Sequence, residues 1–272
     1  MYLCIDVGGT KTLIACLDEN GVIIEKIKIP TSRVYKTFLK DIQGVLQDFN
    51  NNQFVAGAIG VPAALIDRDK RIAHKFSNLP WINVSIAEDI EAITNCKIFM
   101  ENDSKLGGLS EAMLIKENYS KVMYISISTG IGYSFIDNLR IDTNTGDGGG
   151  RMLLVEKDGT YVPWENLASG QAIVKLYGKM AKDIISTDTW MKISTDITKG
   201  ISILVSIFQP QIIIFGGSVG NFFDKYGDLV RNNLIDYHIP YITLPKLKGA
   251  ERSDDAVIYG CYDYIKQRIN GE

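Results

Sequence analysis

The chain has 272 residues, of which 46% are hydrophobic and 22% are charged, and its formal net charge is −3 at pH 7. These values are typical of a globular protein with one large core or two medium domains. They provide no broad basic face for nucleic-acid binding, and no apolar run reaches membrane-spanning length. The first residues enter an apolar segment without a signal-peptide pattern, so we expect a cytoplasmic protein.

The first predicted element is a hairpin around a glycine-rich turn. The apolar run 2–5 leads into residues 6–12, Asp-Val-Gly-Gly-Thr-Lys-Thr, and apolar residues resume at 13–17. Two adjacent glycines leave backbone N–H groups open to a ligand. Such a turn can hold phosphate, with Asp6 binding Mg²⁺ through water. An ordinary β-hairpin is the alternative, and we would prefer it if the turn stood alone.

The rest of the first half alternates between strands and helices. A strand at 22–29 precedes a helix at 35–49 with apolar residues at helical spacing, and a buried strand follows at 54–62. A second helix at 86–95 leads to a strand at 97–100. This order of elements predicts an α/β layer fold with a mixed sheet.

The second half repeats this beginning. A strand at 122–128 enters a glycine turn at 129–132, and a second strand leaves it at 133–139. A buried strand at 211–215 ends in Gly-Gly-Ser-Val-Gly at 216–220. Two similar halves suggest an internal duplication with a nucleotide site in a cleft between them. We expect domains at 1–115 and 116–272, the first with one phosphate loop and the second with the other phosphate loop and a nucleotide loop.

In this order the motifs resemble the ROK family of sugar kinases and sugar-responsive repressors along nearly the whole chain. The segments that carry the resemblance are 6–11, 60–62 with 77–81, 101–104, 128–132, 164–170 and 216–219. The resemblance implies an α/β fold of two ribonuclease-H-like domains, of the actin-like ATPase superfamily, with mixed sheets around a central cleft. It also implies an ATP- and Mg²⁺-dependent kinase for a hydroxyl of a small sugar, and a homodimer.

The resemblance assigns roles to individual residues. Asp103, between a strand and a helical stretch, would be the general base that takes the proton of the attacking hydroxyl. A helix cap is the alternative for this segment, and we favour the base. The residues expected to hold the sugar are Asn78, Asn102, Asp103 and Glu165. Those expected at the nucleotide are Asp6, Gly8, Gly9, Thr10, Lys11, Thr129, Gly130, Gly216, Gly217 and Ser218; for Lys11, an exposed lysine without a phosphate contact is an equal alternative.

One segment departs from the family pattern. Where the family has Glu-x-Gly-His, residues 147–152 read Asp-Gly-Gly-Gly-Arg-Met, so Gly148 replaces the glutamate and Arg151 the histidine. Residues 156–164 also lack the family's cysteine cluster, so we expect no structural zinc. Asp147 or a neighbour could take over a hydroxyl of glucose or an N-acetylhexosamine, or Arg151 could pair with a sugar acid. For Arg151 itself we prefer a structural salt bridge.

Two further functions stay open as alternatives. The first is a non-catalytic sugar-sensing regulator derived from such a kinase; repressors of the family carry a helix-turn-helix before the first loop, and here that loop begins at Asp6. The second is another actin-like activity, such as an acetate-type kinase or an ATPase chaperone. The segment 101–103 argues against the second alternative.

Overall fold

The computed structural model describes residues 1–49, 53–237, 241–252 and 254–271. They divide into two compact units. The first unit contains Met1–Ser110 and Asp255–Glu272, and the second contains Glu111–Asp254. Each unit is built around a five-stranded mixed sheet.

The sheet of the first unit has the order β3-β2-β1-β4-β8. Three strands joined by tight turns pair antiparallel, whereas β4 and β8 lie parallel to β1 because helices connect them. The strands are β1 (Tyr2–Val7), β2 (Lys11–Leu17), β3 (Ile23–Pro30), β4 (Ala56–Val61) and β8 (Lys97–Asn102), and the connecting helices are α1 (Tyr35–Asp48) and α2 (Ile86–Thr94). These elements agree with the predicted order.

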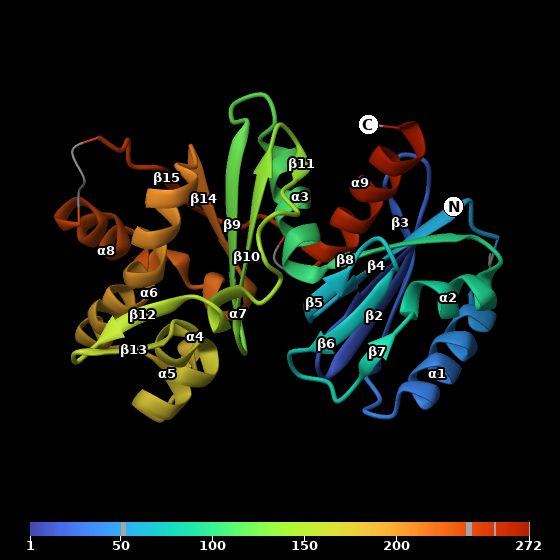
Figure 1. Cartoon of the computed structure of the whole chain (residues 1–272), viewed down its shortest axis with the longest axis horizontal. Helices are drawn as coiled ribbons and strands as arrows, with labels where there is room; N and C mark the ends of the chain where they lie inside the picture. The colour runs from blue at the N-terminus through green and yellow to red at the C-terminus, as the bar shows by residue number, and fades with distance from the viewer. Residues whose placement is uncertain (50–52, 238–240, 253, 272) are drawn as a thin grey trace. The chain divides into compact units, whose positions relative to one another are not determined.

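Alternation along β1 sends side chains to both faces of this sheet. Leu3 and Ile5 belong to the core cluster that includes Phe38 of α1 and Ile86 of α2. Figure 1 shows both helices on this side of the sheet. Asp6, one residue further along β1, therefore points to the opposite face.

That opposite face is covered by α9 (Ala256–Asn270), which packs on β1 and β4. The thiol of Cys261 on α9 donates to the backbone carbonyl of Ile5 at 3.7 Å, and Gly260 lies against the backbone of Leu106. The sequence predicts this segment in a domain 116–272, but in the structure the chain returns to the first unit at Asp255. The other boundary lies inside α3 (Asp103–Leu114) rather than after it.

A small antiparallel sheet that the sequence does not predict follows β4. It consists of β5 (Ala63–Asp67), β6 (Ile72–Phe76) and β7 (Ile82–Val84). Trp81, before β7, packs on Phe38 with ring centroids 4.7 Å apart and donates its indole N–H to the Arg33 carbonyl. These contacts anchor the segment 77–81 to the core of the first unit.

The second unit repeats the topology of the first, with the order β11-β10-β9-β14-β15. Again the first three strands pair antiparallel and the other two lie parallel to the strand at the centre. The strands are β9 (Lys121–Ile127), β10 (Ile131–Asp137), β11 (Arg140–Ile141), β14 (Ile212–Gly216) and β15 (Lys246–Gly249). Two similar halves are thus present, as the glycine turns predict.

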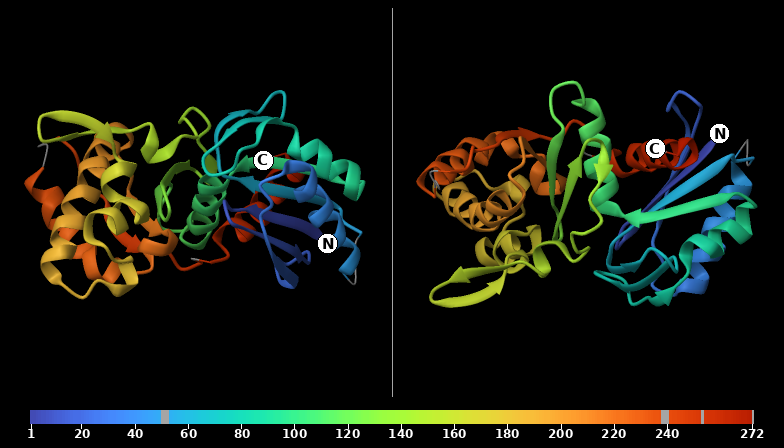
Figure 2. Two further views of the ribbon diagram at one scale, coloured as in Figure 1. Left: turned by 90° about the horizontal axis from the view of Figure 1, so that it is seen from below. Right: turned by 45° about the horizontal axis from the view of Figure 1, so that its top comes forward.

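Two helices that the sequence does not single out build the core of the second unit. They are α6 (Thr187–Phe208) and α8 (Phe223–Asp236), which pack on each other and on β9 and β14. The β12–β13 hairpin (Leu154–Lys157 and Thr160–Pro163) lies at the margin of this unit (Figure 2). It leads into α4 (Glu165–Ala168) and α5 (Gly170–Tyr177), and α7 (Gly217–Gly220) follows β14. Among the described residues, no helix is both long and apolar enough to cross a membrane.

Candidate functional site

The first glycine loop connects β1 to β2 and is held by backbone hydrogen bonds. The Gly8 N–H donates to the Lys11 carbonyl at 2.9 Å, and the Thr31 N–H donates to the Thr10 carbonyl at 3.0 Å. Gly8 therefore uses its N–H inside the loop, which leaves Gly9 and Thr10 as the better candidates for phosphate donors. Thr10 and Lys11 are exposed.

Asn78 lies directly against this loop. A Cβ added to Gly9 would lie 2.8 Å from the Asn78 Cβ, so the two residues are in close contact. The segment around Asn78 is fixed by the Ser77 N–H, which donates to the Pro62 carbonyl at 2.9 Å. Of the residues predicted to bind the sugar, Asn78 is thus beside the predicted phosphate donors.

Two carboxylates lie at the carboxyl ends of parallel strands in the first unit. Asp6 is near the end of β1, and Asp103 directly follows β8. In the strand register, Asp6 pairs with Gly60 of β4, which pairs with Glu101 of β8. The carboxyl ends of such strands are the usual place for a ligand in an α/β sheet.

The pKa values of both carboxyl groups are raised. Burial raises the pKa of Asp6 from 3.8 to about 7, with a further contribution from the negative charge of Asp103; Lys28 opposes the shift. Burial also raises the pKa of Asp103 to about 6, although hydrogen bonds from Ser104 favour its ionised form. A carboxyl group with a pKa near neutral pH is suited to accept a proton from a substrate.

Asn102 forms the cap of α3. Its side-chain oxygen accepts the Ser104 N–H at 3.0 Å and the Lys105 N–H at 3.3 Å, and its amide nitrogen donates to the Ala63 carbonyl at 3.1 Å. The capping role considered for this segment is therefore confirmed for Asn102. The amide has a second N–H, through which a sugar contact stays possible as a prediction.

Asp103 uses one oxygen within its own helix turn. Its Oδ1 accepts the Ser104 N–H at 2.7 Å and the Ser104 hydroxyl at 3.4 Å. The position at the first residue of α3 also places the carboxylate at the positive end of the helix dipole. These hydrogen bonds on Oδ1 fix the orientation of the carboxyl group.

The second glycine loop, in the second unit, is organised by Ser128. The Ser128 N–H donates to the Gly130 carbonyl at 2.9 Å, and the Ser128 carbonyl accepts the Gly170 N–H at 2.7 Å. Its hydroxyl accepts the Ser218 N–H at 3.0 Å. Ser128 therefore ties together three segments that the sequence predicts at the nucleotide and the sugar, although the sequence assigns it no role of its own.

Glu165, at the start of α4, is engaged by two partners. Its Oε2 accepts the Ile131 N–H at 3.0 Å, and its Oε1 accepts Nε and Nη2 of Arg151 at 3.1 and 2.9 Å. The loop carries glycine at position 130 because a Cβ there would collide with the Glu165 carboxylate. The structural salt bridge preferred for Arg151 is confirmed, and its partner is the residue predicted to bind the sugar.

The predicted nucleotide loop follows β14. Gly217 has φ of +81°, a left-handed conformation that favours glycine, and its backbone lies against Ile127 and Ser128. Gly216 is buried beside the Tyr124 ring, whereas Ser218 is exposed. Gly217 is partly exposed, and Ser218 is the most exposed of these three residues and therefore the most accessible to a bound nucleotide.

Mg²⁺ is the metal implied by the resemblance. Among the described residues, no three His, Cys, Asp or Glu side chains converge as a metal cage. Mg²⁺ needs no such cage, since proteins commonly bind it through one or two carboxylates, substrate phosphates and water. The Asp6 carboxylate beside the first loop fits that kind of site.

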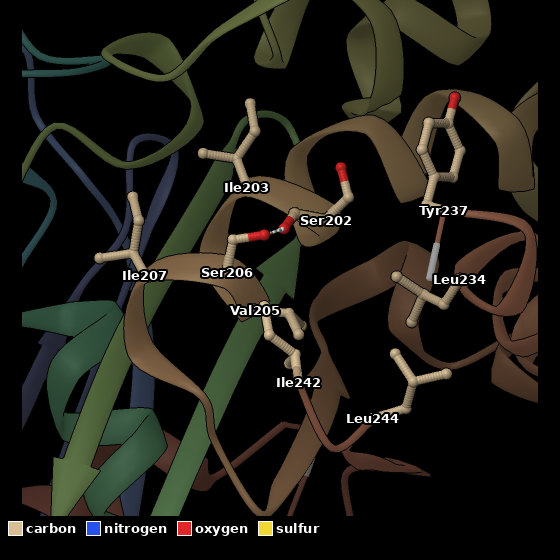
Figure 3. A pocket seen from close by; sticks show the side chains of 9 residues that line it. All are labelled: Ser202, Ile203, Val205, Ser206, Ile207, Leu234, Tyr237, Ile242 and Leu244. Carbon is tan, nitrogen blue, oxygen red and sulfur yellow. Dashed lines mark hydrogen bonds between the residues drawn. The ribbon is translucent and has the colours of Figure 1, made fainter. Parts of the chain in front are cut away.

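An apolar pocket of about 310 Å³ lies elsewhere in the second unit. It is formed by aliphatic side chains of α6, of α8 and of the segment before β15, with Ser202, Ser206 and Tyr237 at its polar positions (Figure 3). None of the predicted site residues lines it. We therefore assign the candidate site to the strand ends rather than to this pocket.

The predicted residues thus fall into two sets. The first unit brings together the first loop, Asp6, Asn78 and Asp103, with Asn102 in the cap of α3. The second unit brings together the second loop, Glu165 and the loop that contains Ser218. Sequence reasoning missed Thr31, and it placed Ser128 in the second loop without its organising role, since both roles depend on the register and on contacts between distant segments.

Comparison with known proteins gives matches over nearly the whole chain. The model of the ROK family matches residues 2–268. The chain is 24% identical over 313 residues to the glucokinase of Thermotoga maritima, covering 98% of both proteins. It is 26% identical over 260 residues to the fructokinase of Pediococcus pentosaceus, covering 89% of this chain and 88% of that protein.

Solved structures give the same result for the fold. The ROK family glucokinase from Streptomyces griseus, in complex with glucose and AMPPNP, superposes with a TM-score of 0.81 at 18% identity, covering 98% of this chain and 99% of that one. This likeness, together with the two mixed sheets, confirms the α/β actin-like ATPase fold predicted from the sequence.

Proposed function

Since the chain belongs to the ROK family, we propose that it is an ATP-dependent carbohydrate kinase that phosphorylates a hydroxyl of a small neutral sugar. The observation that carries this proposal is that Asp6, next to the first glycine loop, and Asp103 lie at strand ends on the same edge of the sheet of the first unit, close enough for the charge of Asp103 to raise the pKa of Asp6. The glucokinase and fructokinase relatives, matched over most of their length, support the reaction class.

Asp103 is assigned the role of general base. Its carboxylate takes the proton of the sugar hydroxyl while the hydroxyl oxygen forms a bond to the γ-phosphorus of ATP. The bond between that phosphorus and the β–γ bridging oxygen breaks, and ADP leaves. Phosphoryl transfer depends mainly on alignment and on neutralising charge, so the base completes a site whose other parts hold phosphate.

Backbone N–H groups of the two glycine loops are assigned to the phosphates. In the first loop these groups are those of Gly9 and Thr10, because the Gly8 N–H is bonded to Lys11. In the second loop they are those near Thr129 and Gly130, and Gly216, Gly217 and Ser218 are assigned to the nucleoside. Donors fixed before the reaction stabilise the charge that develops in the transition state. Mg²⁺, held by Asp6 through water, would neutralise part of the phosphate charge when bound.

The sugar is assigned to Asn78, Asn102 and Glu165. The Glu165 carboxylate is already paired with Arg151, so the positive charge of Arg151 is matched within the protein. A sugar acid would have to compete with Glu165 for that guanidinium. A neutral sugar needs no such exchange, and the ion pair therefore favours glucose, fructose or N-acetylhexosamine over a sugar acid.

A coupled ADP-release assay with ATP and Mg²⁺ tests the proposal over hexoses, N-acetylhexosamines and sugar acids. We expect turnover with a neutral sugar and its loss in Asp103→Ala. If ATP or a sugar binds but no sugar is turned over, the protein is a sugar-sensing regulator and the kinase proposal is wrong.

The substrate class has its own test in Arg151→Ala. We expect the variant to prefer the same neutral sugar as the wild type, with its KM for that sugar changed by no more than about fivefold, the size of an exposed ion pair. A preference of the wild type for a sugar acid, lost in Arg151→Ala, would contradict the neutral-sugar assignment.

A further inference from the structure

Two buried hydroxyl groups lie beneath the first glycine loop. The Thr12 and Thr31 hydroxyl oxygens are 2.8 Å apart, and the Thr31 hydroxyl donates to the Gly8 carbonyl at 2.8 Å. Thr12 has no exposed surface and Thr31 is 8% exposed. Thr12 lies on β2 and Thr31 directly follows β3, so the strand pairing brings them together.

The direction of each hydrogen bond follows from the number of protons. A threonine hydroxyl has one proton, and that of Thr31 goes to the Gly8 carbonyl. The bond between the two hydroxyls must therefore be donated by Thr12 and accepted by Thr31. The result is a chain of hydrogen bonds, here called the relay, that runs from the Thr12 hydroxyl through the Thr31 hydroxyl to the Gly8 carbonyl. Removal of the Thr31 hydroxyl therefore takes a hydrogen-bond partner from both the Thr12 hydroxyl and the Gly8 carbonyl.

The relay fixes the orientation of a peptide group. In a trans peptide, the carbonyl of one residue and the N–H of the next point in opposite directions. Holding the Gly8 carbonyl toward Thr31 therefore turns the Gly9 N–H away from Thr31. The Thr31 N–H holds the Thr10 carbonyl in the same way, at 3.0 Å, which orients the Lys11 N–H. Thr31 thus secures the loop at two carbonyls.

We propose that Thr31, supported by Thr12, is a positioning residue that presets the Gly9 N–H for the terminal phosphates of a nucleoside triphosphate. The inference rests on the proposed function, in which this loop holds phosphate. Consecutive N–H groups bind anions well when their directions are fixed in advance. Two glycines in sequence are flexible, and the relay supplies the rigidity that the loop lacks.

The test compares Thr31→Val with Thr31→Ser. Valine keeps the shape of threonine and removes the hydroxyl, whereas serine keeps the hydroxyl. We expect Thr31→Val to weaken MgATP binding about tenfold, the upper size for one buried hydrogen bond, and Thr31→Ser to stay within about twofold of wild type. Calorimetric titration with MgATP measures this without turnover, and steady-state assays should show the KM for ATP rising while the KM for the sugar stays constant.

Thr12→Val is the second variant, because it breaks the relay outside the loop; we expect a smaller loss of MgATP affinity than for Thr31→Val. Circular dichroism and the melting temperature identify any variant that fails to fold. The inference is overturned if Thr31→Val and Thr31→Ser bind MgATP equally, or if the KM values for ATP and sugar rise together. If the wild type binds MgATP but turns over no sugar, the proposed function is contradicted, whereas the role of Thr31 in MgATP binding is not. If the wild type does not bind MgATP, both the proposed function and the role of Thr31 are contradicted.

Discussion

Gly130 of the second glycine loop is in contact with Glu165, the residue predicted to bind the sugar. We therefore predict that adding a side chain at Gly130 will impair use of the sugar. In Gly130→Ala, the new Cβ would lie 3.0 Å from Glu165 Cδ and closer still to Oε2. Carbon atoms normally approach to about 3.5–4.0 Å, so the Glu165 side chain must retreat by roughly 1 Å. Its hydrogen bonds to the Ile131 N–H and to Arg151 would then be stretched or broken.

The two costs of that movement differ in size. Losing these partly exposed hydrogen bonds should lower the free energy of unfolding by about 1–2 kcal/mol. Misplacing a substrate-positioning group by roughly 1 Å costs up to about 10²-fold in rate. We therefore expect Gly130→Ala to fold and to lose between about 10- and 100-fold in kcat/KM for the sugar, measured by ADP release.

Two controls make this prediction specific. Gly146→Ala introduces the same methyl group into the loop that follows β11, where no atom lies within 4 Å of the new Cβ, and it should behave as wild type. In a Glu165→Ala background, Gly130→Ala should have little further effect on the sugar, since the residue it displaces is gone. The reasoning is refuted if Gly130→Ala matches Gly146→Ala, or if its effect is equally large without Glu165.

Two further predictions come from the carboxylates of the first unit. Because the pKa of Asp103 is about 6 and the base must be ionised, kcat/KM should fall about tenfold per pH unit below pH 6; Asp103→Asn should lower kcat by about 10²–10⁴-fold and remove this pH dependence. A wild-type profile that stays flat down to pH 5 would contradict that role. The pKa of Asp6 is raised to about 7, so its contribution to stability is present below pH 4 and is lost as the pH rises through 7. Without nucleotide or Mg²⁺, Asp6→Asn should therefore increase the free energy of unfolding at pH 8 by on the order of 2 kcal/mol and have little effect at pH 4; equal denaturant midpoints of variant and wild type at pH 8 would contradict the shift.

Local patterns predict much of this fold because the relevant signals are short in range. The glycine turn after β1 and the apolar runs of β4 and β14 are defined within a few residues, and repetition of strand, turn and strand predicts two similar sheets. The small sheet β5–β7 was not predicted, since its strands have few and irregularly spaced buried residues. The placement of α9 was not predicted either, because helical periodicity says nothing about which sheet the helix will cover.

The candidate site also contains residues that local patterns predict and residues that they do not. Asp6, Asp103 and the glycine loops are recognisable because each follows a strand directly. For Arg151, a salt bridge was only one of several possibilities. Its partner Glu165 lies 14 residues further along the chain and comes close only because the β12–β13 hairpin folds between them. Thr31 gave no signal, because a threonine after a strand is common and its role depends on the β2–β3 register.

The central claim is transfer of a phosphoryl group to a sugar hydroxyl with Asp103 as the base. Its most direct test is mass spectrometry of the products formed from ATP, Mg²⁺ and the best neutral sugar, with wild-type protein and Asp103→Asn side by side. We predict a sugar monophosphate and ADP in equal amounts from the wild type, and almost none from the variant. ADP without a sugar phosphate, or equal yields from both proteins, would contradict the account.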